Sequence, residues 1–154
     1  MKRASLNPIR RAALHLLARR DHTLYEITEK LKQAHFPASD IHIVTTELIE
    51  ANQINDLRFV ENYLRQRRAK GYGPLRISME LEARGIKPEV IADEIKITDN
   101  AWVIDAQKTW QKYFKNKPPV DFKSKAKQMR FLQYRGFTRE QIHQLFKNDQ
   151  SYDS

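Results

Sequence analysis

The sequence contains no cysteine and only four glycines. Without cysteine the chain forms neither disulfide bonds nor thiolate zinc sites, a pattern expected of proteins in the reducing cytoplasm. The dipeptides Asn-Gly and Asp-Gly, which mark tight β-hairpins, are also absent, whereas signals that start helices recur along the whole chain. The sequence therefore predicts an all-α protein.

Long apolar runs and enzyme motifs are missing as well. No stretch approaches the roughly 20 apolar residues that span a bilayer, and the first eight residues lack the apolar core of a signal peptide. The chain has no P-loop, nucleophile elbow or dinucleotide fingerprint, and its five histidines show no zinc-binding spacing. We expect a soluble cytoplasmic protein that is not an enzyme and uses neither a metal nor a cofactor.

A short motif recurs at intervals of about 50 residues. Residues 81–86, Leu-Glu-Ala-Arg-Gly-Ile, reappear 51 positions later as residues 132–137, Leu-Gln-Tyr-Arg-Gly-Phe. A weaker copy begins at Leu31 and has His35 in the place of the glycine. Chains of this kind bury a core by stacking neighbouring units. The spacing predicts three tandem three-helix repeats in an elongated, curved modular array, with boundaries at 7–52, 56–97 and 99–148 and a frayed tail at 149–154.

Capping residues predict where several helices begin. Asn7, followed by proline, is expected to start the first helix, and Asp56 the first helix of the second repeat. Thr23 with Glu26 three residues later forms a capping box for another helix. Ser124 aligns with Thr23, so the cap is expected at the same place in each repeat. In the third repeat, an aromatic stripe is expected in the core: Trp102, Trp110, Tyr113 and Phe114.

The net charge of +9 is concentrated in two blocks. Residues 58–87 carry eight Lys and Arg against three acidic residues, and residues 108–139 carry ten against one. Between them, residues 88–107 carry one Lys against five acidic residues. Such patterning is typical of a surface that meets a polyanion, although a solvated helix face is the alternative.

The basic blocks supply the candidate binding residues. In the first block, helix-start amides and flanking arginines favour an anion, and Tyr72 offers a ring for stacking on an unpaired base; turn chemistry alone is the alternative. Lysines in the second block would contact phosphates without reading sequence. The candidates for contact with DNA or a partner protein are Arg65, Arg67, Arg68, Lys70, Tyr72, Gly73, Arg76, Lys112, Lys115, Lys123, Lys125, Lys127, Arg130 and Arg135.

Residues 56–60, 70–77 and 80–86 resemble the RecX family, regulators of the RecA recombinase. The similarity extends to residues 13–23 in the first repeat and to residues 133–137 in the last. The resemblance implies a basic, curved protein of three tandem three-helix repeats that has no catalytic residues. It also implies binding within the RecA filament on single-stranded DNA, limiting its recombinase, ATPase and coprotease activities in DNA recombination, repair and the SOS response.

Other functions fit parts of the pattern. A stand-alone, sequence-independent nucleic-acid-binding protein, acting on single-stranded or duplex DNA, needs only the basic blocks, and a pure protein adaptor needs only the repeats. A helix-turn-helix reader of duplex DNA is disfavoured, because the predicted recognition helices at 39–52 and 87–97 carry acidic residues that repel phosphate. We expect a monomer whose partners are the RecA filament and DNA.

Overall fold

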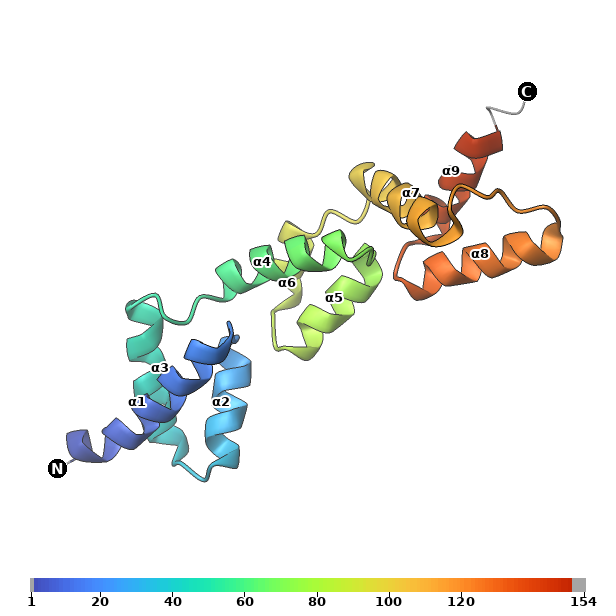
Figure 1. The fold of residues 1–154 in the computed structure, drawn as a ribbon. Coiled ribbons are helices and arrows are strands. Elements are labelled where there is room, and N and C mark those ends of the chain that lie inside the picture. Colours follow the sequence, from blue (N-terminus) through green and yellow to red (C-terminus); the bar gives the residue numbers. More distant parts are fainter. Residues whose placement is uncertain (1, 151–154) are drawn as a thin grey trace. The chain divides into compact units, whose positions relative to one another are not determined.

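The computed structural model describes the backbone of residues 2–150 and the side chains of residues 6–147. Over this part of the chain it contains nine helices and no strand, which confirms the predicted all-α class (Figure 1). None of these helices is long and apolar enough to cross a membrane. The predicted frayed tail, 149–154, falls partly on the last helix and otherwise lies outside the described residues.

The helices follow one another as three tandem groups of three. The first repeat contains α1 (Lys2–Arg19), α2 (Leu24–Gln33) and α3 (Ala38–Glu50). The second contains α4 (Asp56–Ala69), α5 (Pro74–Ala83) and α6 (Pro88–Glu94). The third contains α7 (Ala101–Phe114), α8 (Phe122–Tyr134) and α9 (Arg139–Gln150).

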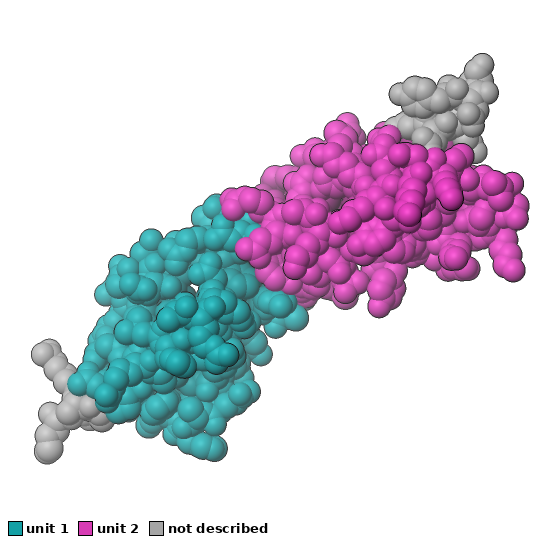
Figure 2. Space-filling model, viewed as in Figure 1, with its two compact units in different colours: residues 1–62, 81–90 teal, residues 63–80, 91–154 magenta. Residues whose placement is uncertain are grey.

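The chain forms two compact units whose boundary does not follow the repeats (Figure 2). Unit 1 comprises the chain up to Asn62 together with Leu81–Val90, and unit 2 comprises Tyr63–Glu80 and the chain from Ile91 onward. The boundary therefore runs through α4 and α5 of the second repeat. Each unit combines one terminal repeat with part of the middle repeat.

In unit 1, α1, α2 and α3 each contact the other two helices. Their apolar faces enclose a core of Leu6, Ile9, Ala13, Ile27, Leu31, Ile41, Val44, Leu48 and Ile54. Burying one such aliphatic side chain contributes about 1.5–3 kcal/mol. This core is what makes the first repeat fold as predicted from the helical spacing of its apolar residues.

In unit 2, α7 contacts α8 and α9, which also contact each other. Trp102 and Trp110 are buried as predicted, and the Trp110 indole Nε1 donates to the buried Gln128 side chain at 2.8 Å. Phe114 is half-buried, but Tyr113 is exposed. The prediction that Tyr113 belongs to the core is therefore wrong: its ring centre lies 4.9 Å from that of Phe131 in α8, but 43% of the residue stays exposed at the edge of this contact.

Consecutive repeats are joined by the motif that recurs along the sequence. In unit 1, Thr23 at the start of α2 donates through Oγ1 to the carbonyl of Arg84 at the end of α5, at 2.7 Å. A Cβ atom on Gly85, which has φ +79°, would overlap the side chain of Tyr25 in α2. The start of one repeat's middle helix thus packs on the end of the next repeat's middle helix.

Unit 2 contains the same junction one repeat later. The amides of Gly73 and Leu75 donate to the carbonyls of Arg135 and Gly136, at 2.8 and 2.9 Å. A Cβ atom on Gly136, at φ +104°, would overlap Arg76 in α5. Glycine is required at both junctions because a neighbouring helix fills the space.

The first repeat has His35 where the other two have glycine. His35 has φ +67°, so it keeps the left-handed backbone that ends the middle helix in all three repeats. Its side chain is exposed, and no earlier repeat packs on it in the described part of the chain. A side chain is therefore tolerated at this position, at the cost of backbone strain alone.

Several predicted helix starts are corrected by the structure. The capping box of Thr23 and Glu26 is confirmed. The first helix begins at Lys2, not Asn7, so Pro8 lies inside α1 and not at its first position. Asn55 caps α4 by accepting from the amide of Arg58 at 2.9 Å.

Asp56, which was predicted to cap α4, has another role. Its Oδ1 accepts from the amide of Leu24 at 2.9 Å, so it stabilises the start of α2 in the preceding repeat. In the third repeat, α8 is capped by Asp121, and Ser124 completes that box from three residues further on. Ser124 is therefore not the cap, and α8 begins one turn earlier than its alignment with Thr23 predicts.

Candidate nucleic-acid interface

Three guanidinium groups surround the ring of Tyr72, which lies in the turn between α4 and α5. The guanidinium carbons of Arg67, Arg135 and Arg76 lie 3.8, 4.6 and 4.7 Å from the centre of that ring. They come from the last turn of α4, the end of α8 and the first turn of α5. Each such contact contributes about 0.5–2 kcal/mol. We call Arg67, Tyr72, Arg76 and Arg135 the arginine–tyrosine cluster.

Glu80 anchors one side of this cluster. Arg67 donates to both of its carboxylate oxygens, at 2.9 and 2.7 Å, and the Tyr63 hydroxyl donates at 3.0 Å. Arg76 lies 3.5 Å from the same carboxylate. Partial burial favours the neutral carboxyl, but the hydrogen bonds and positive charges of these partners outweigh burial and lower the pKa of Glu80. Glu80 therefore stays ionised and compensates the charge of Arg67.

Arg135 is held without a carboxylate. Its Nη1 donates to the carbonyl of Lys70 at 3.1 Å, and its guanidinium lies 4.4 Å from the ring centre of Tyr113 and 5.2 Å from that of Phe131. Within the described chain it forms no ion pair. Its position is thus fixed by a carbonyl and aromatic rings, while its charge stays available to an anion.

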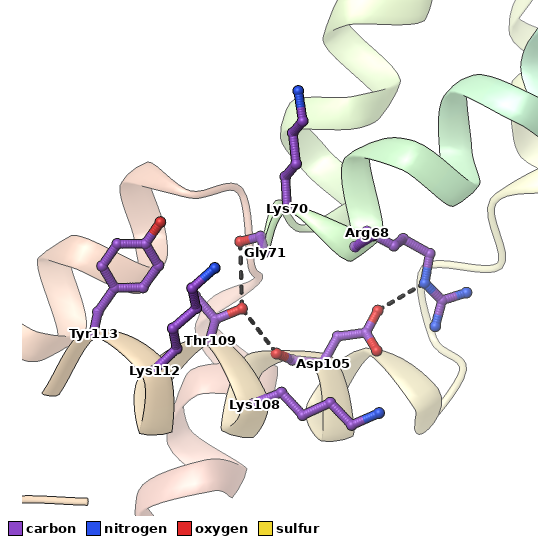
Figure 3. A pocket seen from close by; sticks show the side chains of 9 residues that line it. Arg68, Lys70, Gly71, Asp105, Lys108, Thr109, Lys112 and Tyr113 are labelled. Carbon is purple, nitrogen blue, oxygen red and sulfur yellow. Dashed lines mark hydrogen bonds and ion pairs between the residues drawn. The ribbon is translucent and has the colours of Figure 1, made fainter. Parts of the chain in front are cut away.

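A cleft of about 250 Å³ lies beside the cluster, between the end of α4 and one face of α7 (Figure 3). Arg68 crosses it and donates to Asp105 at 2.7 Å, with its guanidinium 4.4 Å from the ring centre of Trp102. The hydroxyl of Thr109 donates to the Asp105 carbonyl at 2.9 Å and lies 3.4 Å from the carbonyl oxygen of Gly71. We call this the lysine cleft; its lining residues are Arg68, Ala69, Lys70, Gly71, Asp105, Lys108, Thr109, Lys112 and Tyr113.

The lysine cleft carries uncompensated positive charge. Asp105 is the one acidic residue in its lining, and it is engaged by Arg68. Lys70, Lys108 and Lys112 form no ion pair with any described residue, and all three are exposed. Arg135, which contacts the Lys70 carbonyl and the Tyr113 ring, adds a fourth cation beside the cleft.

This chemistry fits phosphate groups. Lysine ammonium groups act as point charges that neutralise phosphates without reading bases, and an arginine held on aromatic rings is already ordered before it meets an anion. No group of His, Asp and Glu side chains suited to holding a metal ion is found in the described part of the chain. This arrangement of charges is of a kind that suits a polyanionic ligand.

The fold brings seven of the predicted residues into this interface. Five belong to the first basic block and two to the second; they are Arg67, Arg68, Lys70, Tyr72, Arg76, Lys112 and Arg135. Lys115, Lys123, Lys125, Lys127 and Arg130 show no hydrogen bond or ion pair with these seven residues in the described part of the chain. Lys125 instead lies 6.0 Å from the ring centre of Phe146, while Lys115, Lys123, Lys127 and Arg130 are exposed elsewhere, as is Arg65.

Gly73 has a different role from the one predicted. Free amides at the start of α5 were expected to bind an anion, but those of Gly73 and Leu75 donate to the carbonyls of the third repeat. A Cβ atom on Gly73 would lie 2.5 Å from the backbone of Gly136. Gly73 therefore supports the interface by allowing two repeats to approach, and its amide is not free for a ligand.

Sequence reasoning placed Lys108 in the second basic block without selecting it as a candidate, and it missed Tyr113 and Tyr134. Lys108 and Lys112 are four residues apart, which places them on one face of α7 together with Asp105. That spacing was a usable signal. For Tyr134, whose ring lies 5.4 Å from the guanidinium of Arg76, no local pattern gave the contact, because the two residues are 58 positions apart.

The fold defines a tandem three-helix-repeat protein, and one of its surfaces carries uncompensated positive charge. Family models for the first, second and third three-helix domains of RecX match residues 10–48, 55–94 and 105–146. The chain belongs to the RecX family.

Individual relatives agree with this assignment. Regulatory protein RecX of Legionella pneumophila (strain Corby) is 40% identical over 140 residues, covering 91% of this chain and 93% of that protein. Regulatory protein RecX of Pseudomonas entomophila (strain L48) is 37% identical over 145 residues, covering 94% of both. The crystal structure of RecX from Lactobacillus salivarius matches with a TM-score of 0.81 at 21% identity, covering 93% of this chain and 95% of that one.

Proposed function

We propose that this protein regulates RecA by binding the RecA filament on single-stranded DNA and limiting its ATPase, strand-exchange and coprotease activities. It acts in the cytoplasm, as a monomer and without catalysing a reaction. The family supports the regulatory part of this proposal, since its relatives carry the name Regulatory protein RecX. The observation that carries the DNA-binding part is the group of four unpaired cations, Lys70, Lys108, Lys112 and Arg135.

The charges allow a quantitative expectation. Each phosphate neutralised on a single strand contributes about −0.7 to the slope of log affinity against log salt concentration. Four cations therefore give a slope of about −3, with no preference among sequences. If the protein also contacts RecA, several weak contacts add up to tight binding along the filament, which would hinder rearrangement of RecA or access of duplex DNA.

A stand-alone nucleic-acid-binding protein is the second candidate. The observation in its favour is that the lysine cleft and Arg135 lie within one compact unit and need no partner to be positioned. This alternative predicts the same affinity for single-stranded DNA with and without RecA, whereas the filament proposal predicts tighter binding when RecA is present.

The test adds purified protein to RecA assembled on single-stranded DNA and follows ATP hydrolysis and strand exchange. Inhibition at stoichiometric amounts is expected, and no effect on either activity would refute the proposal. The double variant K108E/K112E should lose most of the inhibition. R11E/R19E, which makes the same change in net charge on the exposed face of α1, should retain it.

The remaining lysine candidates are tested in the same assay. K123E/K127E reverses two exposed charges near the start of α8, away from the lysine cleft. If this variant keeps DNA binding but loses inhibition, the start of α8 contacts RecA. If it loses DNA binding as well, the phosphate-binding surface extends along α8.

A further inference from the structure

Tyr134, the last residue of α8, presents an aromatic ring at the edge of the interface and is 79% exposed. The guanidinium of Arg76 lies 5.4 Å from the centre of this ring, and its Nη1 is 3.4 Å from the Tyr134 carbonyl oxygen. Arg76 is itself held by the ring of Tyr72 and by the carboxylate of Glu80. The exposed ring of Tyr134 therefore rests on an anchored guanidinium group.

The other rings of the interface are already occupied. Tyr72 contacts three guanidinium groups, so a base would have to displace one of them. Tyr113 contacts Arg135 on one side and the ring of Phe131, whose centre is 4.9 Å away, on another. Tyr134 has one guanidinium contact and an exposed surface for a further planar group.

We propose that Tyr134 stacks on an unpaired base of single-stranded nucleic acid while Arg135 and the lysine cleft bind the neighbouring phosphates. This inference rests on the proposed function and adds a determinant of strand type to it. The faces of a base in a duplex are covered by the adjacent base pairs, whereas an unpaired base can leave its stack. Stacking on an aromatic side chain contributes about 1–3 kcal/mol per base and is tolerant of sequence.

Tyr134 then distinguishes single strands from duplexes, which the lysines alone cannot do. Phosphates are present in both, and the lysines contact them without regard to the bases. Loss of the ring should therefore lower affinity for single strands and leave affinity for duplex DNA unchanged.

Phe122 provides a matched control on the same helix. It begins α8, is 88% exposed, and makes no contact with a guanidinium group in the described structure. An effect at Tyr134 that is absent at Phe122 therefore reports position in the interface, not exposure of an aromatic ring on α8.

The experiment uses fluorescence of the full chain. The native Trp102 and Trp110 are buried, so an exposed tryptophan introduced by Y134W or F122W can be followed after subtraction of the parent signal. The ligands are an oligo-dT strand and an abasic strand of the same length, which share their phosphates but not their bases. We expect oligo-dT to quench Y134W, the abasic strand to leave it unchanged, and F122W to respond to neither.

Affinities measured by anisotropy give a second readout. Y134A should bind oligo-dT about 5- to 150-fold more weakly, the range that corresponds to the loss of one stacked base. Its affinity for the abasic strand should equal that of the parent, and Y134F should bind oligo-dT as the parent does. Equal weakening for both strands, or none for either, would overturn the inference, as would equal quenching of Y134W and F122W.

Failure of this inference is distinct from failure of the proposed function. If Y134A inhibits RecA and binds oligo-dT like the parent, stacking is refuted and the regulatory proposal stands. If the parent binds no oligonucleotide, stacking is refuted too, and the ATPase assay with RecA then decides the regulatory proposal separately.

Discussion

The junction between the second and third repeats makes Gly136→Ala the sharpest test of how the repeats are joined. Gly136 has φ +104°, and a Cβ atom placed on it would overlap the Cβ of Arg76 and lie 2.7 Å from the Arg76 amide nitrogen. The substitution therefore strains the backbone and pushes α5 away from α8. The matching change in the first repeat is His35→Gly, at φ +67°, where no helix packs on the side chain.

The two substitutions should have opposite signs. A non-glycine residue in the left-handed region costs about 1–2 kcal/mol. At Gly136 this backbone strain adds to the loss of the two hydrogen bonds donated by Gly73 and Leu75, each of which contributes about 0.5–1.5 kcal/mol. We therefore expect Gly136→Ala to destabilise by about 2–5 kcal/mol. For His35→Gly, relief of strain exceeds the added entropy of glycine in the unfolded chain, giving stabilisation of up to about 1 kcal/mol.

Urea denaturation separates these effects. Both tryptophans belong to unit 2, so tryptophan fluorescence follows the unit that contains Gly136, while circular dichroism at 222 nm follows all helices. Gly136→Ala should move the fluorescence transition to lower urea, and His35→Gly should leave that transition in place. A loss below 1 kcal/mol for Gly136→Ala, or destabilisation by His35→Gly, would refute the account of the junctions.

Three further predictions concern single interactions. Glu80→Gln should lower the free energy of unfolding by about 1–3 kcal/mol at pH 7, since it leaves Arg67 without its charged partner. Because the pKa of Glu80 is lowered in the folded protein, this difference in stability from the parent should be full above pH 4.5 and vanish as the pH falls through the lowered pKa. Urea midpoints measured across this pH range test the prediction. Burial lowers the pKa of His22, whose Nδ1 lies 2.9 Å from the Arg20 carbonyl and whose Nε2 accepts from Lys30 at 3.0 Å. Because the unfolded chain then binds a proton more readily than the folded one, unit 1 should lose stability as the pH falls below 6.5. His22→Gln should remove this pH dependence in melts followed by circular dichroism. Asn55→Ala should lower the free energy of unfolding by about 1 kcal/mol in the same melts, because α4 loses its N-cap. An unchanged melting midpoint would show that Asn55 does not cap α4.

Local chemistry made much of the fold predictable. The capping box of Thr23 and Glu26 depends on residues within one turn, and the structure contains it as expected. Apolar spacing at 3.6 residues identified the helices because a helix buries one stripe of its surface. The recurring glycine was recognised as a helix end, although its second purpose, to admit the neighbouring repeat, involves residues about 60 positions away.

The two misplaced helix caps share one cause. Asp56 and Ser124 are good capping residues, but each lies near another polar residue that can cap the same helix. Asn55 and Asp121 cap α4 and α8, and the Asp56 carboxylate instead accepts a hydrogen bond from the start of α2 in the preceding repeat. Local rules rank such neighbours almost equally, so the sequence alone did not decide between them.

By itself the sequence determined the helical class, the repeat period and the presence of two basic blocks, since these follow from local spacing and composition. Only the tertiary structure decided which charges are available to a partner. Glu80 and Asp105 compensate Arg67 and Arg68 across helices, whereas Lys108 and Arg135 form no ion pair with any residue that the structure describes. Net charge is a sum along the chain, but ion pairing depends on distances of 3–4 Å between residues that only folding brings together.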